Sequence, residues 1–284
     1  MIRKRLRNIF SRKIQALAAQ DTQAVYRMDT GLSLPQTANK QYTIDDWEPL
    51  HPELWRWETW RAALLFSPEA EALNLSPYVE RLGEGIFHFQ CFQSGVLQKL
   101  AAEISHLETW ALEKGVDIVP PNSMHEYGCT AELLGLDQII QKIVTTVFEQ
   151  FAQQYFPEFS GFPIDHHHSF TVTYGQRYDR SLGFHADDSE ITFNFCLGGD
   201  FIGSELYFQG RRCFQHMQTE YHPAEHIEII QKLGWCIVHA GLHRHGVLPI
   251  LHGERRSLII WARSQRYRES AFQECAPWCG YAEK

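Results

Sequence analysis

The sequence has no apolar run near the roughly 20 residues that a membrane-spanning helix needs, so no transmembrane segment is expected. It also lacks an excess of positive charge: 26 Lys and Arg face 34 Asp and Glu, for a net charge of −8. This balance argues against a general nucleic-acid binder. No internal repeat or low-complexity tract is present. With 44% apolar and 21% charged residues, the chain is expected to bury an ordinary globular core.

The chain also lacks the cysteine pattern of a disulfide framework. Its seven cysteines are an odd number and are spread along the sequence, which predicts reduced thiols and an intracellular, cytoplasmic location. Cys275 and Cys279, in the segment CAPWCG, have a spacing that a zinc site can use. Two thiols without a second pair are weak evidence for a metal. Ordinary packed or exposed cysteines are therefore the expectation here.

The first fifteen residues, MIRKRLRNIFSRKIQ, lack the continuous apolar stretch of a secretory signal. Six of the first thirteen are basic, and apolar residues recur every four positions, which predicts a basic amphipathic helix. A surface helix packed on the domain is the expected role. A membrane-surface anchor and a transit-like segment are the alternatives. Residues 1–84 as a whole are predicted to form a helical and irregular N-terminal extension.

Residues 85–284 are predicted to form the main domain. Strong periodicity predicts amphipathic helices over residues 94–115 and 131–156, with Ser94 as the N-cap of the first and Gly115 ending it. After Pro163 the pattern changes to short β-rich runs separated by glycine, proline and acidic turns. Helices followed by many short strands indicate an α+β fold with a sandwich-like or barrel-like β core.

One histidine and one aspartate mark the start of such a β-rich run. In GFHADDSEITFNF, His185 and Asp187 are two residues apart, so in a strand both side chains point to the same face. One imidazole and one carboxylate make up two of the three ligands of the two-histidine, one-carboxylate iron site. His239, His243 and His245 are the candidates for the third ligand. Strand geometry alone does not choose between His243 and His245, because they share a face.

An arginine further along the chain indicates a ligand with carboxylates. In the strand-like run ERRSLIIWAR, Arg255 and Ser257 share one face and Arg256 lies on the other. One of the two arginines therefore faces the core, where a guanidinium needs a carboxylate partner. If the protein offers none, a dicarboxylate ligand supplies it.

Taken together, H-x-D followed by H-(x)9-R-x-S in a β-rich context resembles the Fe(II)- and 2-oxoglutarate-dependent dioxygenases of the prolyl and lysyl hydroxylase type. In that family the distal histidine lies ten residues before the arginine, a spacing that His245 has and His243 lacks. The resemblance thus implies that His185, Asp187 and His245 hold Fe(II). It further implies that Arg255, with Ser257, binds the far carboxylate of 2-oxoglutarate.

Two more residues match cosubstrate positions of the lysyl hydroxylases. Tyr174 lies eleven residues before the first ligand and Asn194 nine residues after it. The resemblance implies that both contact 2-oxoglutarate. Packing of a strand tyrosine and a half-buried asparagine, without any ligand, is the alternative for each.

Several longer segments resemble a narrower group, the 2-oxoglutarate and iron-dependent oxygenase domain-containing protein 2 family. They include PNSMHEYG, SFTVTYGQ, HADDSEITFNFCLGGDFIGSELYF and HGVLPILHGERRSLIIWAR, within roughly residues 85–280. This resemblance implies a double-stranded β-helix, or jelly-roll, core with flanking N-terminal helices. It also implies O2 as the second cosubstrate and ascorbate as a reductant. The sequence departs from the family pattern at Gly203-Ser204, where relatives usually carry Gly-Gly.

The implied activity is hydroxylation of a protein or peptide side chain, or of a small molecule, with release of succinate and CO2. The carboxylate ligand Asp187 favours hydroxylation, since related halogenases leave that position to chloride. No catalytic residue beyond the metal ligands is predicted. The alternative is a non-catalytic jelly-roll binding module that retains the pocket. Metal-assisted hydrolysis is disfavoured because it gives the inward arginine no role.

Overall fold

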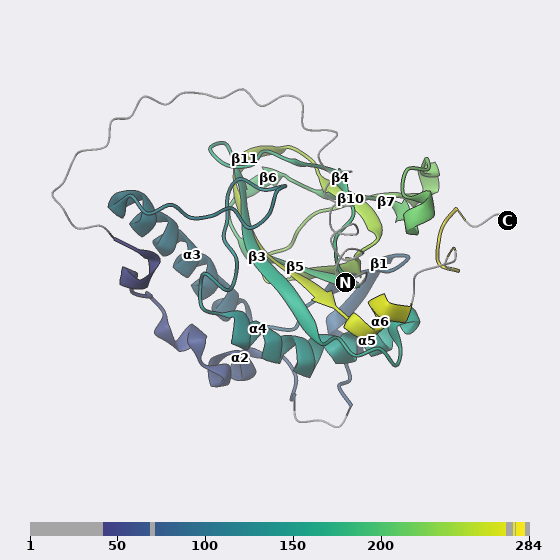
Figure 1. Cartoon of the computed structure of the whole chain (residues 1–284), viewed down its shortest axis with the longest axis horizontal. Coiled ribbons are helices and arrows are strands. Elements are labelled where there is room, and N and C mark those ends of the chain that lie inside the picture. The colour runs from purple at the N-terminus through teal and green to yellow at the C-terminus, as the bar shows by residue number, and fades with distance from the viewer. Residues whose placement is uncertain (1–41, 69–71, 271–274, 276, 282–284) are drawn as a thin grey trace, which may run out of the picture.

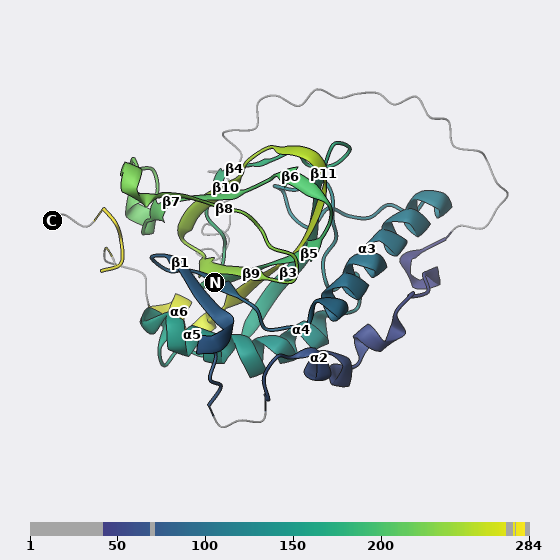
Figure 2. The same ribbon diagram turned by 180° about the vertical axis from the view of Figure 1, so that it is seen from behind.

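The protein is described here by a computed structural model that covers residues 42–68, 72–270, 275 and 277–281. A layer of helices packs against one side of a curved β structure (Figure 1). Seen from behind, the strands of the second sheet lie on the side away from these helices (Figure 2). The basic amphipathic helix predicted near the N-terminus lies outside the described residues.

The helices follow the predicted periodicity with two corrections at their ends. The helix predicted to begin with Ser94 as its cap has Gln93 in the N-cap position, and Gly115, at φ 68°, ends it as predicted. The helix predicted from residue 131 begins only at Asp137, because Gly135 adopts a φ of 70° that an α-helix excludes. The helices are α2 (Trp57–Ala63), α3 (Ser94–Lys114), α4 (Asp137–Ile143), α5 (Glu149–Tyr155) and α6 (Gln265–Ser270).

Helices α4 and α5 run almost continuously, joined by a π-helical turn at Val144–Phe148. Short 3-10 helices occur at Ile44–Asp46, Pro52–Trp55, Ser76–Tyr78, Pro157–Phe159, Phe214–His216 and Pro223–Glu225. Helices α3, α4 and α5 thus precede the long run of strands that begins at His166, as the order of sequence patterns predicts.

The strands form two antiparallel sheets. The larger sheet has the order β1-β2-β9-β5-β11-β3, with β6 on β11, and the smaller one has the order β4-β10-β7-β8. Their bounds are β1 (Val79–Gly83), β2 (Ile86–Phe89), β3 (His166–Gly175), β4 (Leu182–His185), β5 (Ile191–Gly198), β6 (Phe201–Gly203), β7 (Leu206–Arg211), β8 (His226–Ile229), β9 (Cys236–Ala240), β10 (His243–Val247) and β11 (Ile250–Arg263).

From β3 onward the chain passes repeatedly from one sheet to the other. Strands β3, β5, β9 and β11 belong to the larger sheet, and β4, β7, β8 and β10 belong to the smaller one. Four strands facing four strands in this alternating order make a double-stranded β-helix. The predicted α+β fold with this core and with N-terminal helices is confirmed.

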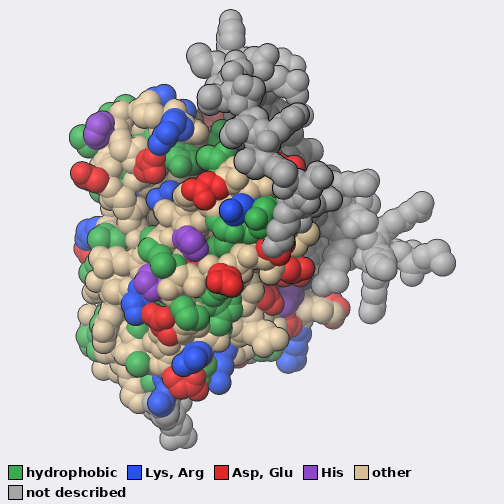
Figure 3. All heavy atoms as spheres, turned by 90° about the vertical axis from the view of Figure 1, so that its left-hand side faces the viewer, with side chains coloured by type: hydrophobic (Ala, Val, Ile, Leu, Met, Phe, Trp, Pro, Cys, Tyr) green, Lys and Arg blue, Asp and Glu red, His purple; other side chains and the backbone are tan. Residues whose placement is uncertain are grey.

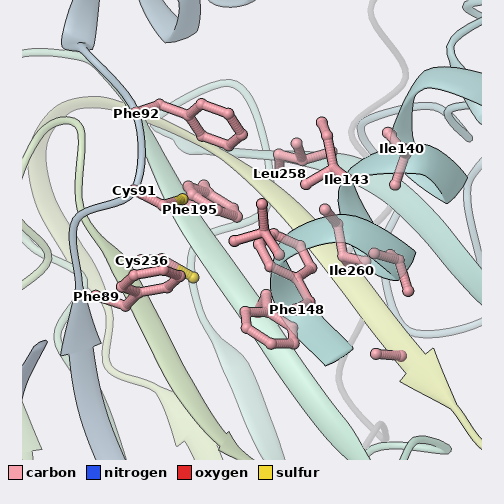
Figure 4. Packing of buried hydrophobic residues seen from close by; sticks show 14 of the residues in the cluster. Phe89, Cys91, Phe92, Ile140, Ile143, Phe148, Phe195, Cys236, Leu258 and Ile260 are labelled. Carbon is pink, nitrogen blue, oxygen red and sulfur yellow. The ribbon is translucent and has the colours of Figure 1, made fainter. Parts of the chain in front are cut away.

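The main hydrophobic core lies between the helices and the larger sheet. Phe148 of the π-helical turn stacks on Phe193 of β5 with ring centroids 3.9 Å apart. Figure 4 shows Phe195, Leu258 and Ile260 directed from the sheet toward the helices. Burying apolar side chains of this size contributes about 1.5–3 kcal/mol each. This packing fixes the larger sheet, and with it the strands that carry the polar residues of its other face.

The segment before β2 is packed against the same core. Leu54 and Trp60 are buried in it, and the indole N–H of Trp60 donates a hydrogen bond of 2.8 Å to the Leu54 carbonyl. Glu103 on α3 accepts the backbone N–H groups of Leu50 and His51. The domain boundary predicted between residues 84 and 85 falls in the turn that joins the paired strands β1 and β2.

The outer face of the helices carries mixed charges. On the side seen in Figure 3, acidic and basic side chains alternate with hydrophobic ones over the described surface. Among the residues that the structure describes, no helix combines the length and the apolar character needed to cross a bilayer.

Candidate metal centre

Three predicted ligands meet between the two sheets. His185 ends β4 and faces His245 of β10 directly across the antiparallel pair. Asp187 follows β4, with Oδ1 3.4 Å from Nε2 of His185 and Oδ2 3.7 Å from Nε2 of His245. Their exposed fractions are only 6%, 3% and 4%. The ligand atoms of all three lie within 4.8 Å of one another, as a common metal ion requires.

Backbone carbonyl groups orient both imidazoles. Nδ1 of His185 donates to the Gly183 carbonyl at 2.8 Å, and Nδ1 of His245 donates to the His243 carbonyl at 2.9 Å. In a neutral ring the proton then resides on Nδ1, and the lone pair of Nε2 faces Asp187. Burial lowers the pKa of His245 well below its ordinary value, which keeps that ring neutral and able to bind a metal.

The carboxylate is held in its charged form. Burial opposes ionisation of Asp187, but the adjacent His245 and His185 outweigh it and lower the pKa of the carboxyl. Thr192 of β5 donates its hydroxyl to Oδ2 of Asp187 at 2.6 Å. One ionised carboxylate together with two imidazole nitrogens is the donor set of non-haem Fe(II) centres. The residues present therefore fit the metal that the sequence implies.

The two remaining candidate histidines lie differently. His243 is buried with its ring 5.1 Å from that of Phe208, and its Nδ1 has no hydrogen-bond partner among the described residues. His239 comes from β9 and places Nε2 3.8 Å from Oδ2 of Asp187, with its ring 4.5 Å from His245. The structure thus gathers His245 with the other two ligands and leaves His243 outside.

Arg255 and Ser257 lie on the inward face of β11, as the strand alternation predicts. Arg255 is fully buried; Nε donates to Oγ of Ser204 at 3.0 Å, and one terminal nitrogen donates to Oγ of Ser257 at 3.1 Å. Its other terminal nitrogen has no partner, and no carboxylate forms an ion pair with it, among the residues described here. A buried guanidinium with an unused donor suits an anionic ligand.

Tyr174 forms one wall of this arginine site. The guanidinium carbon of Arg255 lies 4.6 Å from the centroid of the Tyr174 ring, and burial raises the pKa of the phenol well above its ordinary value, so the hydroxyl stays protonated. That hydroxyl lies 3.1 Å from Nε2 of His125, which burial keeps neutral by lowering its pKa to about 3. The predicted Tyr174 and Arg255 are therefore adjacent.

Asn194 also faces the interior, next to Thr192 along β5. Its Oδ1 accepts a 2.9 Å hydrogen bond from Gln231. Its exposed fraction is 7%, so the side chain is buried. The bond to Gln231 gives Asn194 a protein partner on this face.

Several residues of the site were missed by sequence reasoning. His125 and Thr192 contact predicted residues, but neither belongs to a motif with a recognisable spacing. Ser204 is fully buried at φ 63°, and it is the residue at which the sequence departs from the Gly-Gly pattern. That departure was the one signal available for any of the three. It marks a contact with Arg255.

The other histidine and cysteine groups fall elsewhere. His167 and His168 alternate on β3: His167 lies near Asp137, and His168 packs against Trp261. His222 accepts the Ala224 N–H at the start of a 3-10 turn. Cys275 and Cys279 do not belong to the group of His185, Asp187 and His245; they approach other side chains, which are described below.

Comparison with known proteins places these residues in a family. Residues 42–161 match the family model described as OGFOD2-like domain. The 2-oxoglutarate and iron-dependent oxygenase domain-containing protein ICU11 of Arabidopsis thaliana is 38% identical over 217 residues, which are 76% of this chain and 54% of that protein. The CP2 protein of the same plant is 33% identical over 244 residues, with 83% and 61% covered. The chain thus spans only part of the length of these plant relatives.

The human 2-oxoglutarate and iron-dependent oxygenase domain-containing protein 2 is 30% identical over 284 residues, which cover 94% of this chain and 77% of that protein. Among solved structures, a Pseudomonas putida prolyl-4-hydroxylase aligns with a TM-score of 0.40 and 15% identity, covering 64% of this chain and 94% of that one. The extent of the human match, together with the His-Asp-His group, confirms the resemblance found in the sequence. The chain belongs to the 2-oxoglutarate and iron-dependent oxygenase domain-containing protein 2 family.

Proposed function

We propose that the protein is an Fe(II)- and 2-oxoglutarate-dependent oxygenase that hydroxylates a carbon centre and releases succinate and CO2. One observation carries the proposal: a buried His-Asp-His group and a buried arginine with an unused donor lie in the same β-helix interior. The first suits Fe(II), and the second suits the far carboxylate of a dicarboxylate. A 2-oxo dicarboxylic acid can bind both, with its 2-oxo acid end at the metal and its far carboxylate at the arginine.

The proposed metal ligands are His185, Asp187 and His245. Each histidine has Nδ1 committed to a backbone carbonyl, so only Nε2 is available, and Thr192 fixes one oxygen of Asp187. Three protein ligands leave the other positions of an octahedral ion open. Bound there, Fe(II) supplies oxygen activation coupled to oxidative decarboxylation of 2-oxoglutarate and hydroxylation of the substrate.

Arg255 is proposed to anchor 2-oxoglutarate. Ser204 and Ser257 hold two of its nitrogens, so the third is aimed before any ligand arrives. The Tyr174 hydroxyl, which lies 3.1 Å from Nε2 of His125, places a second polar group close to the guanidinium. The free-energy cost of ordering these two groups on binding is small, because packing already fixes them. Asn194 is proposed as a further cosubstrate contact from β5.

The primary substrate is proposed to be a protein or peptide side chain, or a small molecule with an equivalent C–H bond. Ascorbate is proposed as a reductant that keeps the iron in the Fe(II) state. An intracellular, cytoplasmic setting is proposed from the odd number of cysteines in the sequence. A nucleic-acid partner is not proposed, since the net charge is −8.

The test is a titration of the full chain with Fe(II) and 2-oxoglutarate under anaerobic conditions. Chelation of Fe(II) by the 2-oxo acid gives a weak visible metal-to-ligand charge-transfer band, which reports binding independently of turnover. We expect this band in the wild type and its loss in His185→Ala and in His245→Ala. Arg255→Met should weaken 2-oxoglutarate binding by about 30-fold or more, since it removes the charged partner of a buried carboxylate.

His243→Ala is the matched control, because His243 lies two residues before His245 on the same strand and is also buried. It should keep the band. Succinate release under oxygen then separates an oxygenase from a binding module that retains the pocket and from a metal-dependent hydrolase. A folded, iron-supplied wild type with neither band nor succinate would refute the proposal.

A further inference from the structure

A second group of metal-ligating side chains lies beyond the end of β7 in the smaller sheet. Cys213 and His216 follow β7, and Cys275 and Cys279 belong to the C-terminal segment. One ligand atom from each lies within 4.8 Å of the other three. In Figures 1 and 2 the helical turns after β7 and the coloured segment of residues 277–281 lie next to each other in both views. The chain thus brings together residues that are up to 66 positions apart.

The distances within this group match a single tetrahedral ion. Nδ1 of His216 lies 3.3, 3.5 and 3.6 Å from the sulfurs of Cys213, Cys275 and Cys279, and the sulfurs of Cys213 and Cys275 are 3.9 Å apart. With Zn–S at about 2.3 Å and Zn–N at about 2.0 Å, a tetrahedron separates sulfur from nitrogen by about 3.6 Å and sulfur from sulfur by about 3.8 Å.

Other thiol chemistry fits these distances less well. A disulfide needs sulfurs about 2.05 Å apart, far below the 3.9 Å between Cys213 and Cys275. An iron–sulfur cluster holds several metal atoms between its cysteine ligands, whereas these four ligand atoms leave space for one ion. Three thiolates and one imidazole without an open position form a closed Cys3His set, which is the structural rather than the catalytic type of zinc site.

We propose that Cys213, His216, Cys275 and Cys279 bind one structural Zn2+ ion that fastens the C-terminal segment to the loop after β7. The two metal centres of the molecule are then chemically distinct. Thiolates select zinc, while the imidazole and carboxylate ligands between the sheets suit Fe(II). The Cys213–His216 pair lies far from the Cys275–Cys279 pair in the sequence, so a shared ion would join the C-terminal segment to the loop after β7.

Surrounding contacts support this fastening role. The Cys213 N–H points to the sulfur of Cys279 at 3.4 Å, the kind of second-sphere hydrogen bond that steadies a metal-bound thiolate. On the C-terminal segment, the Trp278 ring lies 3.8 Å from the Arg211 guanidinium carbon, and the Gly280 N–H donates to the Arg211 carbonyl at 3.0 Å. Arg211 is paired with His243 on β10, the strand that also carries His245. The ion would therefore brace the smaller sheet near the iron ligands.

Two buried arginines, Arg212 and Arg244, lie beside the loop after β7. Arg212 forms two hydrogen bonds with the Glu225 carboxylate, and Arg244 of β10 donates to the carbonyls of Gln209 and Met217. Both guanidinium groups lie within electrostatic reach of Cys279. A Zn2+ ion with three thiolates has a net charge of −1, which these cations complement.

The experiment measures metal content by mass spectrometry of the elements on the full chain, grown with zinc and dialysed against a mild chelator. We expect about one zinc per wild-type chain, retained in Asp187→Ala and in His245→Ala. Cys275→Ser and Cys279→Ser should each lower zinc at least tenfold. Cys129→Ser is the matched control, a buried cysteine far from the group in the fold, and should keep the ion.

Cobalt substitution gives a second, spectroscopic reading of the ligand set. Co2+ added to the metal-free wild type should give thiolate charge-transfer bands and the intense visible bands of tetrahedral coordination, and these should be unchanged in Asp187→Ala. Three results would overturn the proposal: a wild type without zinc, zinc that is lost from Asp187→Ala but kept in Cys279→Ser, or a native disulfide among the three cysteines. The first and third results leave the oxygenase proposal untouched, and the second would place zinc at Asp187 and so count against Fe(II) there as well.

Discussion

The two faces of the larger sheet are built from the same strands but solve opposite problems. Toward the helices, β5 and β11 present phenylalanine, leucine and isoleucine side chains, which join the main core. Toward the smaller sheet, the same strands present Thr192, Asn194, Arg255 and Ser257, all with exposed fractions of 7% or less. Alternation along each strand separates the two sets.

The two sets of side chains differ in the interaction that stabilises them when they are buried. The helix-facing side chains are stabilised by leaving water, roughly in proportion to their apolar area. Each polar side chain of the inner face needs a specific partner instead, because an unsatisfied buried polar group costs about 1–3 kcal/mol. Where the described residues supply no partner, as at one nitrogen of Arg255, a ligand is expected to do so. Stability and chemistry are thus assigned to opposite faces of one sheet.

The largest test of this separation is Phe148→Ala. Its ring stacks on Phe193 on the helix side, so truncation should lower the free energy of unfolding by about 3–5 kcal/mol. Binding of Fe(II) and 2-oxoglutarate to the folded protein should change less than threefold. Urea denaturation and the anaerobic titration measure the two effects. Thr145→Ala, on the exposed side of the same turn, should stay within about 0.5 kcal/mol; an equally large loss there would show that the turn itself is responsible.

The separation of faces could be predicted from the sequence because it depends on a period of two. That period placed Arg255 and Ser257 together and Arg256 opposite, which is the arrangement found: Arg256 pairs with Glu108 of α3 on the helix side. The choice of His245 over His243 needed the family spacing, because two residues on the same face are equivalent to any strand rule.

The partners of these residues could not be predicted, since they come from distant parts of the chain. His125 reaches Tyr174 across 49 positions, and Cys213 reaches Cys275 across 62. Neither contact leaves a periodic trace, because each comes from a loop or a terminal segment. The start of α4 was misjudged for a local reason: hydrophobic periodicity continues through Gly135, but its backbone conformation does not. Local sequence patterns thus predict which face of a strand a residue lies on, whereas its contact partner is known only from the fold.

A smaller effect is expected from Thr192→Val, which keeps the strand and the side-chain shape while it removes the hydroxyl bonded to Asp187. Loss of such an outer-sphere hydrogen bond typically weakens metal binding by about 10–100-fold. Titration of Fe(II) at saturating 2-oxoglutarate, followed by the charge-transfer band, measures it. Thr171→Val is the matched change on the helix-facing side of the same sheet. Thr171 lies on β3, and its hydroxyl donates to the Cys129 carbonyl. It should cost about 1 kcal/mol of stability and leave iron affinity unchanged; equal losses of affinity in both variants would mean that the faces are not independent.

The smallest effect contrasts two aspartates. Asp187 is the more buried, yet its pKa is lowered by the histidines beside it, while burial without such neighbours raises the pKa of Asp179 to about 6. Asp179 accepts the N–H groups of Glu126 and Tyr127, next to His125.

Because the pKa of Asp179 is higher in the folded state than the ordinary 3.8, its contribution favours folding at low pH and is lost as the pH rises from about 4 to about 6. Asp179→Asn should remove this loss and raise stability by about 0.5–1 kcal/mol at pH 7 but not at pH 4, after allowance for solvent screening. Urea midpoints of both proteins at the two pH values measure the difference, and a variant less stable than the wild type at pH 7 would show that the two backbone hydrogen bonds require the charge.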